Sequence, residues 1–315
     1  MNEDQHLSPV EVELFTQPHR LERKLKQLHK GAVLTKGEFV TDIPGYVNDM
    51  EWNFFDELHR YYVHNTYHDM LKVFSGKSFS VNIVKPGNLP VFIQVANAKV
   101  APNLFYQTMS ILGVFYIHQI MELEQLDRQV RLTRRWYTVS HWLFRPLHGF
   151  LNRSLMKLQV KQEEEDNDII RHRRLQLRDD GFRFTTDKAD FTNSNQLTHN
   201  VIFPESDLES RVSIVHVTDD KVESLKAGIL ELMAKKEAGG LRVWPGICPH
   251  EGAAMTGEHI CNGVAECPWH GLKFDGVLLE EGGAPWSFMA FDVSLGAGEL
   301  VVKRAGNVST QPAAA

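Results

Sequence analysis

This sequence has few cysteines, no long apolar run and no excess of positive charge. Each of these shortages excludes a class of protein. The 315 residues include three cysteines, too few for a disulfide scaffold, so we expect a reducing, cytoplasmic setting. The longest apolar run, residues 111–117, is far shorter than a bilayer span, and the acidic first residues lack the apolar core of a secretory signal. A net charge of -6 gives no bulk attraction to nucleic acid. We therefore expect a soluble cytoplasmic protein with no transmembrane segment and no nucleic-acid partner.

The hydrophobic pattern changes along the chain and predicts two successive folds. Periodic apolar residues predict helices, and β-branched or aromatic runs predict strands between them. Short strands and tight turns begin near residue 206. The predicted helices are 10–29, 49–74 and 145–180, the last as one long helix or two short ones. The predicted strands are 78–84, 91–100, 105–123 and 128–140. The sequence thus predicts an α+β domain followed by a small all-β domain.

Four regions follow from this pattern. We expect an N-terminal helix and linker at 1–45, a first domain at 46–204, a second domain at 205–308 and a flexible tail at 309–315. The chain is long enough for two domains of ordinary size.

The second domain contains two Cys–His pairs that suit a metal site. Cys248-x-His250 is followed, after sixteen residues, by Cys267-x-x-His270, with Pro and Gly around each pair. Zinc fingers usually pair ligands of one kind, whereas here each half mixes a cysteine with a histidine. A [2Fe–2S] cluster in which one iron takes two cysteines and the other takes two histidines fits this pattern. The segment from about 210 to 305 resembles a Rieske iron–sulfur domain.

The resemblance narrows to one type of Rieske protein. The Rieske proteins of quinol-oxidising complexes carry one extra, disulfide-linked cysteine in each loop, and this chain has Ala253 and Trp269 at those positions. It therefore resembles the oxygenase or ferredoxin type, which implies a lower reduction potential. Glu251 is a departure, because the oxygenases often have arginine there.

A second motif lies in the first domain. Asp56-x-x-His59-x4-His64 resembles the mononuclear iron motif of Rieske non-haem iron oxygenases, in which two histidines and one carboxylate bind Fe(II). Positions five apart do not share a face of a regular helix, so this pair requires a distorted helix. His64 and His68, four apart, would share one face and remain the alternative pair.

The acidic run at 163–166 offers the carboxylate ligand. The segment resembles the acidic stretch of steroid-type Rieske oxygenases, which assigns Asp166 as the third iron ligand, with Asp168 as the alternative. The same charges also fit a solvated helix with acidic residues early and basic residues late.

The resemblance to Rieske non-haem iron oxygenases of the ring-hydroxylating α-subunit type carries further expectations. It implies a helix-grip catalytic domain followed by the all-β Rieske domain, in circularly permuted order. It also implies a catalytic role for Asp56, which would link His59 to His270 of a Rieske cluster, usually across a homotrimer. An apolar or aromatic small molecule would be hydroxylated, dealkylated or desaturated with O₂.

Electrons would come from NAD(P)H through a separate ferredoxin or flavin reductase, because the sequence has no flavin or nicotinamide fingerprint. The alternative is a Rieske electron-transfer protein fused to a non-catalytic binding domain. Both hypotheses require a [2Fe–2S] cluster as cofactor, and the oxygenase hypothesis also requires a mononuclear Fe(II).

Overall fold

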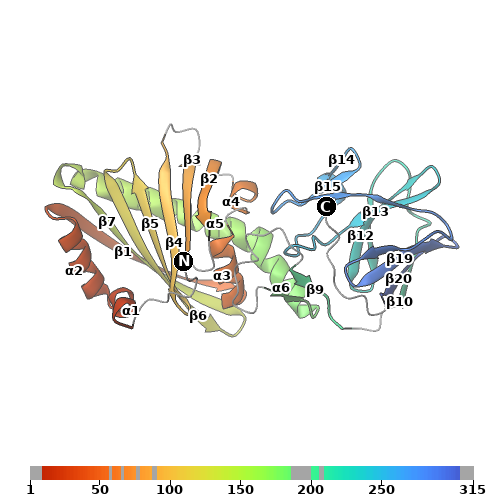
Figure 1. Cartoon of the computed structure of the whole chain (residues 1–315), viewed down its shortest axis with the longest axis horizontal. Coiled ribbons are helices and arrows are strands. Elements are labelled where there is room, and N and C mark those ends of the chain that lie inside the picture. The colour runs from red at the N-terminus through yellow and green to blue at the C-terminus, as the bar shows by residue number, and fades with distance from the viewer. Residues whose placement is uncertain are drawn as a thin grey trace. The chain divides into compact units, whose positions relative to one another are not determined.

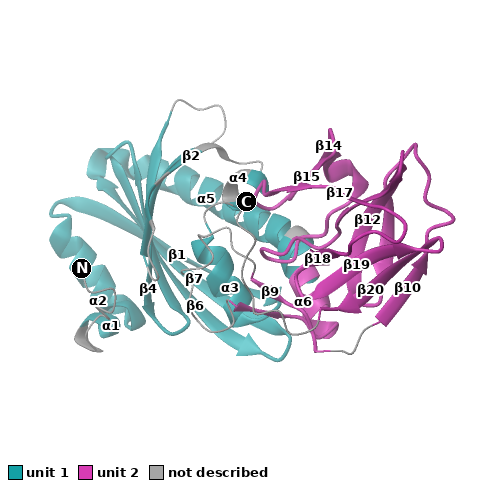
Figure 2. Cartoon of the chain, turned by 45° about the vertical axis from the view of Figure 1, so that its right-hand side comes forward, with its two compact units in different colours: residues 1–172, 186–196 teal, residues 173–185, 197–315 magenta. Residues whose placement is uncertain are grey.

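The chain divides into two compact units, each with its own sheets. One unit consists of residues 1–172 and 186–196, and the other of residues 173–185 and 197–315 (Figure 2). The computed structural model describes residues 9–56, 59–64, 67–75, 79–86, 91–185, 200–205 and 209–305. In this described part of the chain, no helix is long and apolar enough to cross a membrane.

One antiparallel sheet of seven strands forms the first unit (Figure 1). Strands β2 to β7 follow one another across the sheet as a meander, and β1 pairs with β7 at the edge. The strands are β1 (Ala32–Pro44), β2 (Tyr67–Ser75), β3 (Phe79–Pro86), β4 (Ile93–Ala101), β5 (Leu104–Ile111), β6 (Phe115–Leu126) and β7 (Gln129–His141).

Helices cover both faces of this sheet. On one face lie α1 (Pro9–Thr16) and α2 (Pro18–Leu28), whose Leu21 and Leu25 pack with Ile120 and Tyr137. The other face receives the 19-residue α5 (His148–Asp166), where Asn152 accepts a hydrogen bond of 2.6 Å from the Thr138 hydroxyl (Figure 1). A sheet closed around one long helix is the helix-grip arrangement, and the predicted fold class is confirmed.

Short helical segments precede and follow α5 in the chain. Helices α3 (Val47–Phe55) and α4 (His59–Tyr62) lie between β1 and β2 in the chain, and the 3-10 helix Trp142–Leu147 leads into α5. After Asp166 the helix widens into a π-helical segment, Asn167–Arg171, before α6 (His172–Asp179). Such segments interrupt α-helices most often at functional sites.

The second unit is built from short antiparallel strands around an apolar core. Its two four-stranded sheets have the orders β10-β20-β19-β18 and β11-β12-β13-β17. Leu232, Leu241 and Val302 are among the fully buried core residues. The remaining strands of the unit form a three-stranded and a two-stranded sheet. Its strands are β8 (Arg183–Phe184), β9 (Val201–Ile202), β10 (Glu209–Ser213), β11 (Glu223–Ala227), β12 (Leu230–Glu237), β13 (Gly240–Pro245), β14 (Ile260–Cys261), β15 (Val264–Glu266), β16 (Lys273–Asp275), β17 (Val277–Leu279), β18 (Trp286–Phe288), β19 (Phe291–Gly296) and β20 (Glu299–Arg304).

Two predicted elements differ from the structure. The single helix predicted at 49–74 was wrong, because α3 ends at Phe55, α4 has four residues and β2 begins at Tyr67. Bulky apolar residues occur in strands as well as in amphipathic helices, so the spacing of the apolar residues alone could not distinguish a helix from a strand here. The linker predicted before residue 45 instead forms β1, whose Gly37 lies against the ring of Trp136 on β7. The observed units also divide at residue 172, so α6 belongs with the second unit.

Candidate metal centres

Two tight loops of the second unit carry the four residues predicted to bind the [2Fe–2S] cluster. Both loops use the same backbone pattern: the cysteine N–H donates to the carbonyl five residues ahead, and the cysteine carbonyl accepts from a glycine four residues ahead. The bonds are Cys248 N to Ala253 O at 2.9 Å, Gly252 N to Cys248 O at 2.9 Å, Cys267 N to Leu272 O at 2.7 Å and Gly271 N to Cys267 O at 2.8 Å. Both glycines have positive φ, +89° and +66°, a conformation that glycine adopts without steric cost.

The four side chains lie together in the interior of the second unit. Cys248, His250, Cys267 and His270 are all buried, and the two histidine Nδ1 atoms are 3.2 Å apart. Two nitrogen ligands of one tetrahedral metal, each about 2.1 Å from it, lie about 3.4 Å apart, so the imidazoles have the spacing of a shared metal. A hydrogen bond with Cys248 lowers the pKa of the Cys267 thiol to about 5, whereas burial raises the pKa of Cys248. The donor set therefore fits a Rieske cluster.

A buried ion pair supports the first cluster loop. Glu251 and Arg174 are fully buried and form a salt bridge, and the Asn200 amide donates to the other Glu251 oxygen at 2.7 Å. The Arg174 guanidinium stacks 3.7 Å from the centre of the Phe184 ring. Glu251, next in sequence to His250, thus takes part in a compensated buried network rather than in surface recognition.

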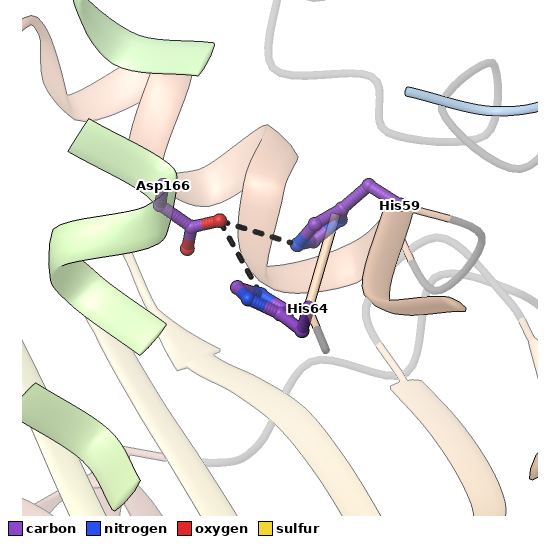
Figure 3. Close-up of side chains that lie close together, drawn as sticks. All are labelled: His59, His64 and Asp166. Carbon is purple, nitrogen blue, oxygen red and sulfur yellow. Dashed lines mark ion pairs between the residues drawn. The ribbon is translucent and has the colours of Figure 1, made fainter. Parts of the chain in front are cut away.

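The second candidate centre, in the first unit, combines residues from three segments. His59 lies at the start of α4, His64 just after it and Asp166 at the end of α5. Figure 3 shows both imidazoles pointing at one carboxylate oxygen, Asp166 Oδ1, which is 3.7 Å from His59 Nε2 and 3.3 Å from His64 Nε2. All three side chains are buried, and their ligand atoms lie within 4.8 Å of one another. Two histidines and one carboxylate are the donor set of non-haem Fe(II) sites, so these residues fit the ion.

A carboxylate lies near the opposite nitrogen of each histidine. Asp56 Oδ2 lies 3.7 Å from His59 Nδ1, and His64 Nδ1 donates a hydrogen bond of 2.9 Å to Glu165 Oε2. Metal-bound histidines usually donate their second N–H to a carboxylate or carbonyl in this way, which fixes the ring and its tautomer. The bond to Glu165 therefore holds the His64 ring with Nε2 toward Asp166.

Arg171 lies on the far side of the Asp166 carboxylate. Arg171 Nη2 lies 3.5 Å from Asp166 Oδ2 and 2.7 Å from Glu163, and Glu163 also accepts from Arg134 at 2.8 Å. Burial raises the pKa of Asp166, and Arg171 partly opposes that rise. Burial also raises the pKa of Glu163, but Arg171 and Arg134 outweigh it and leave that pKa below its usual value. Glu163 is therefore held as a carboxylate between two cations.

A cavity adjoins the three candidate ligands. Its volume is about 100 Å³, and it lies between α3, α5 and the sheet. The lining mixes apolar and polar side chains: Asn53, Phe54, His59, His64, Val95, Gln107, Met109, Met121, Arg134, Leu155, Leu158, Gln159, Gln162, Glu163 and Asp166.

The structure separates the alternatives that the sequence left open. Asp166 is brought to His59 and His64, whereas Asp168 is exposed to solvent. His68 lies on β2 rather than on a helix continuing from His64, and its side chain is outside the described residues. Iron binding at His59, His64 and Asp166 stays a prediction.

Several supporting residues were not predicted as such. Glu165 is in the acidic run that suggested Asp166, but its spacing to His64 depends on the fold. Arg171 and Arg174 fitted a solvated basic helix end equally well, although both are buried. Arg134 comes from a strand and carries no sequence signal for this role.

Comparison with known proteins identifies the domain that contains the cluster loops, but not the domain that contains His59, His64 and Asp166. Residues 200–284 match the Rieske [2Fe-2S] domain family. This segment is a Rieske domain. The match contains all four predicted cluster ligands, and Rieske domains carry a [2Fe–2S] cluster and occur in oxidoreductases. No curated protein matches the chain.

Solved structures resemble the first unit only distantly. The Zhui aromatase/cyclase from Streptomyces sp. R1128 is 9% identical, with a TM-score of 0.36 over 42% of this chain and 91% of its own. Truncated norcoclaurine synthase from Thalictrum flavum is 8% identical, with a TM-score of 0.36 over 43% and 94%. Mll3558 from Rhizobium loti is 13% identical, with a TM-score of 0.33 over 43% and 98%.

Proposed function

We propose that the chain is a Rieske-type oxygenase, which uses O₂ and externally supplied electrons to oxidise a small molecule. The observation that carries the proposal is the meeting of His59, His64 and Asp166 beside a cavity, in a chain that also contains a Rieske domain. A Rieske domain alone supports electron transfer. A mononuclear iron site in the same chain would use those electrons to oxidise a substrate.

The residues have distinct tasks in this proposal. Bound iron would supply open coordination positions for O₂ beside the substrate, and the cluster would supply single electrons. Glu165 orients the His64 imidazole so that Nε2 faces the iron position. Asp56 lies 3.7 Å from His59 Nδ1, and Arg171 lies 3.5 Å from the far oxygen of Asp166. Phe54, Met109 and Met121 exclude water from the reacting region.

Electron supply and assembly are part of the same proposal. Electrons would arrive from NAD(P)H through a ferredoxin or flavin reductase. Asp56, which lies 3.7 Å from His59 Nδ1, would bridge His59 and His270 of a Rieske cluster and so provide the electron path between the two metal centres, and the chain would assemble as a homotrimer. The product would be hydroxylated, dealkylated or desaturated.

Iron content per chain tests the proposal. Full-length protein should contain roughly three irons, and His59→Ala or Asp166→Ala should remove roughly one of them while the Rieske EPR signal stays intact. Asp168→Ala is the matched control, because this exposed aspartate lies two residues from Asp166 and should change nothing. An iron content near two that neither variant alters would contradict the oxygenase and favour an electron carrier fused to a binding domain.

A further inference from the structure

Polar side chains cross the inner face of the seven-stranded sheet in a single row. Ser80 on β3 pairs with Asn97 on β4, Asn97 pairs with Gln107 on β5, and Gln107 pairs with Gln119 on β6. Asn97 donates to the Ser80 hydroxyl at 3.1 Å, and Gln107 donates to the Asn97 carbonyl oxygen at 2.7 Å. Residues directly opposite one another on neighbouring strands share a face, so the row reaches from one side of the sheet to the cavity.

The hydrogen bonding of the row stops at Gln119. This side chain is fully buried, yet neither its amide nitrogen nor its amide oxygen has a hydrogen-bond partner among the described residues. The same holds for the side-chain oxygen of Gln159 on α5, which is 5% exposed. Buried amides without partners destabilise a fold, so native proteins rarely keep them without a use.

One of these two amides lines the cavity, and the other lies beside it. Gln159 and Gln107 line it directly. Gln119 lies opposite Gln107 and two residues before Met121, another lining residue, and alternate residues of a strand face the same side. The amides of Gln107 and Gln119 therefore lie on the face of the sheet that carries the cavity lining, and Gln159 lines the cavity from α5.

The charges of the cavity favour a neutral partner for these amides. Arg134 is the basic lining residue, and its guanidinium already forms a salt bridge of 2.8 Å with Glu163, which Arg171 also contacts. The remaining charged lining residue, Asp166, is a candidate iron ligand. A carboxylate or phosphate would thus find no uncommitted basic side chain among these lining residues, whereas a carbonyl, amide or hydroxyl needs only the amides.

We infer that Gln119 and Gln159 form a subsite for a neutral hydrogen-bonding group of the substrate. The apolar body of the same molecule would lie against Phe54, Met109 and Met121. The inference rests on the proposed function, because the bound molecule is the one to be oxidised. It narrows the expected apolar or aromatic substrate to one with a carbonyl, amide or hydroxyl group. A cavity of about 100 Å³ is smaller than the usual roughly 300–1,000 Å³ of ligand pockets, so it accommodates a small molecule or one end of a larger one.

Calorimetric titration of the full-length, metal-loaded chain without oxygen tests the subsite. The probes are benzamide, toluene and benzoate, which share a ring and differ in the polar group. We expect benzamide to bind at least about tenfold more tightly than the other two, and Gln119→Leu or Gln159→Leu to remove that preference. Gln94→Leu, on an exposed position of β4, should keep it. No preference for benzamide, or a preference that survives in both variants, would overturn the inference.

Thermal unfolding of the same variants shows whether a loss of binding results from a loss of folding stability. Gln119→Leu should leave the melting temperature unchanged or raise it, because no protein hydrogen bond is lost, whereas Asn97→Leu should lower it. A melting temperature lowered as much by Gln119→Leu as by Asn97→Leu would show that Gln119 has a structural partner and would contradict the subsite. Binding is measured without turnover, so this result is independent of the iron count that tests the oxygenase.

Discussion

The interiors beside the two candidate centres differ in how some of their buried polar groups are paired. Beside the candidate cluster, Glu251 is paired with Arg174 and with Asn200, so a charge far from solvent is fully compensated. Beside the candidate iron site, Gln119 and Gln159 keep amide atoms with no partner among the described residues. A compensated interior holds a permanent group in one geometry, whereas unused hydrogen-bonding capacity suits a molecule that enters and leaves. The difference assigns a structural task to one interior and a binding task to the other.

Breaking the buried ion pair of the second unit has the largest expected effect. Arg174→Met should lower the free energy of unfolding by about 3–5 kcal/mol, because Glu251 would remain buried without its cation. The double variant Arg174→Met, Glu251→Leu should recover most of that loss, since both charges are then absent. Urea denaturation of the full-length protein measures both values.

A surface pair provides the control for that experiment. Arg211 contacts Glu209 at 3.0 Å, but both side chains are about half exposed, so Arg211→Met should cost less than about 1 kcal/mol. If Arg174→Met cost no more than Arg211→Met, the second unit would not depend on its ion pair, and the contrast between the units would fail.

The two centres also differ in how much the sequence could predict. The cluster ligands belong to two short loops, and the Pro and Gly residues beside them encode the turns, so residue type and spacing were sufficient to predict a Rieske domain. The second centre joins α4 to the end of α5, about a hundred residues later. The motif predicted which residues form this centre. They come together only because helix α3 ends at Phe55 and because α5 widens into a π-helical segment after Asp166. Neither feature has a local signal as strong as a glycine turn, which is why one helix was predicted across 49–74.

Acid should destabilise the first unit through a histidine on the outer face of its sheet. Burial lowers the pKa of His118 from 6.5 to about 4, and Tyr106 lies 2.6 Å from its Nδ1. The unfolded chain therefore binds a proton more readily, so stability is complete above pH 6.5 and is lost as pH falls toward 4. Between pH 7 and pH 5 this residue should remove about 2 kcal/mol from the free energy of unfolding.

Substitution separates His118 from other acid effects. Urea denaturation at the two pH values should show a smaller pH dependence for His118→Gln than for the wild type. His141→Gln, at an exposed position of β7, should keep the wild-type dependence. Equal pH dependence in all three proteins would mean that His118 does not remain neutral in the folded state.

The smallest expected effect concerns the carboxylate behind His64. Glu165 accepts a hydrogen bond of 2.9 Å from His64 Nδ1, which fixes the ring with Nε2 toward Asp166. Glu165→Gln keeps the size of the side chain but removes its charge, so we expect about tenfold weaker metal binding at the mononuclear site, the lower end of the effect for such supporting groups. Competition with a chelator, followed by metal analysis, measures the affinity. The neighbouring Glu164 is exposed, and Glu164→Gln should bind metal as the wild type does. Equal affinities in the two variants would mean that His64 is positioned by packing alone.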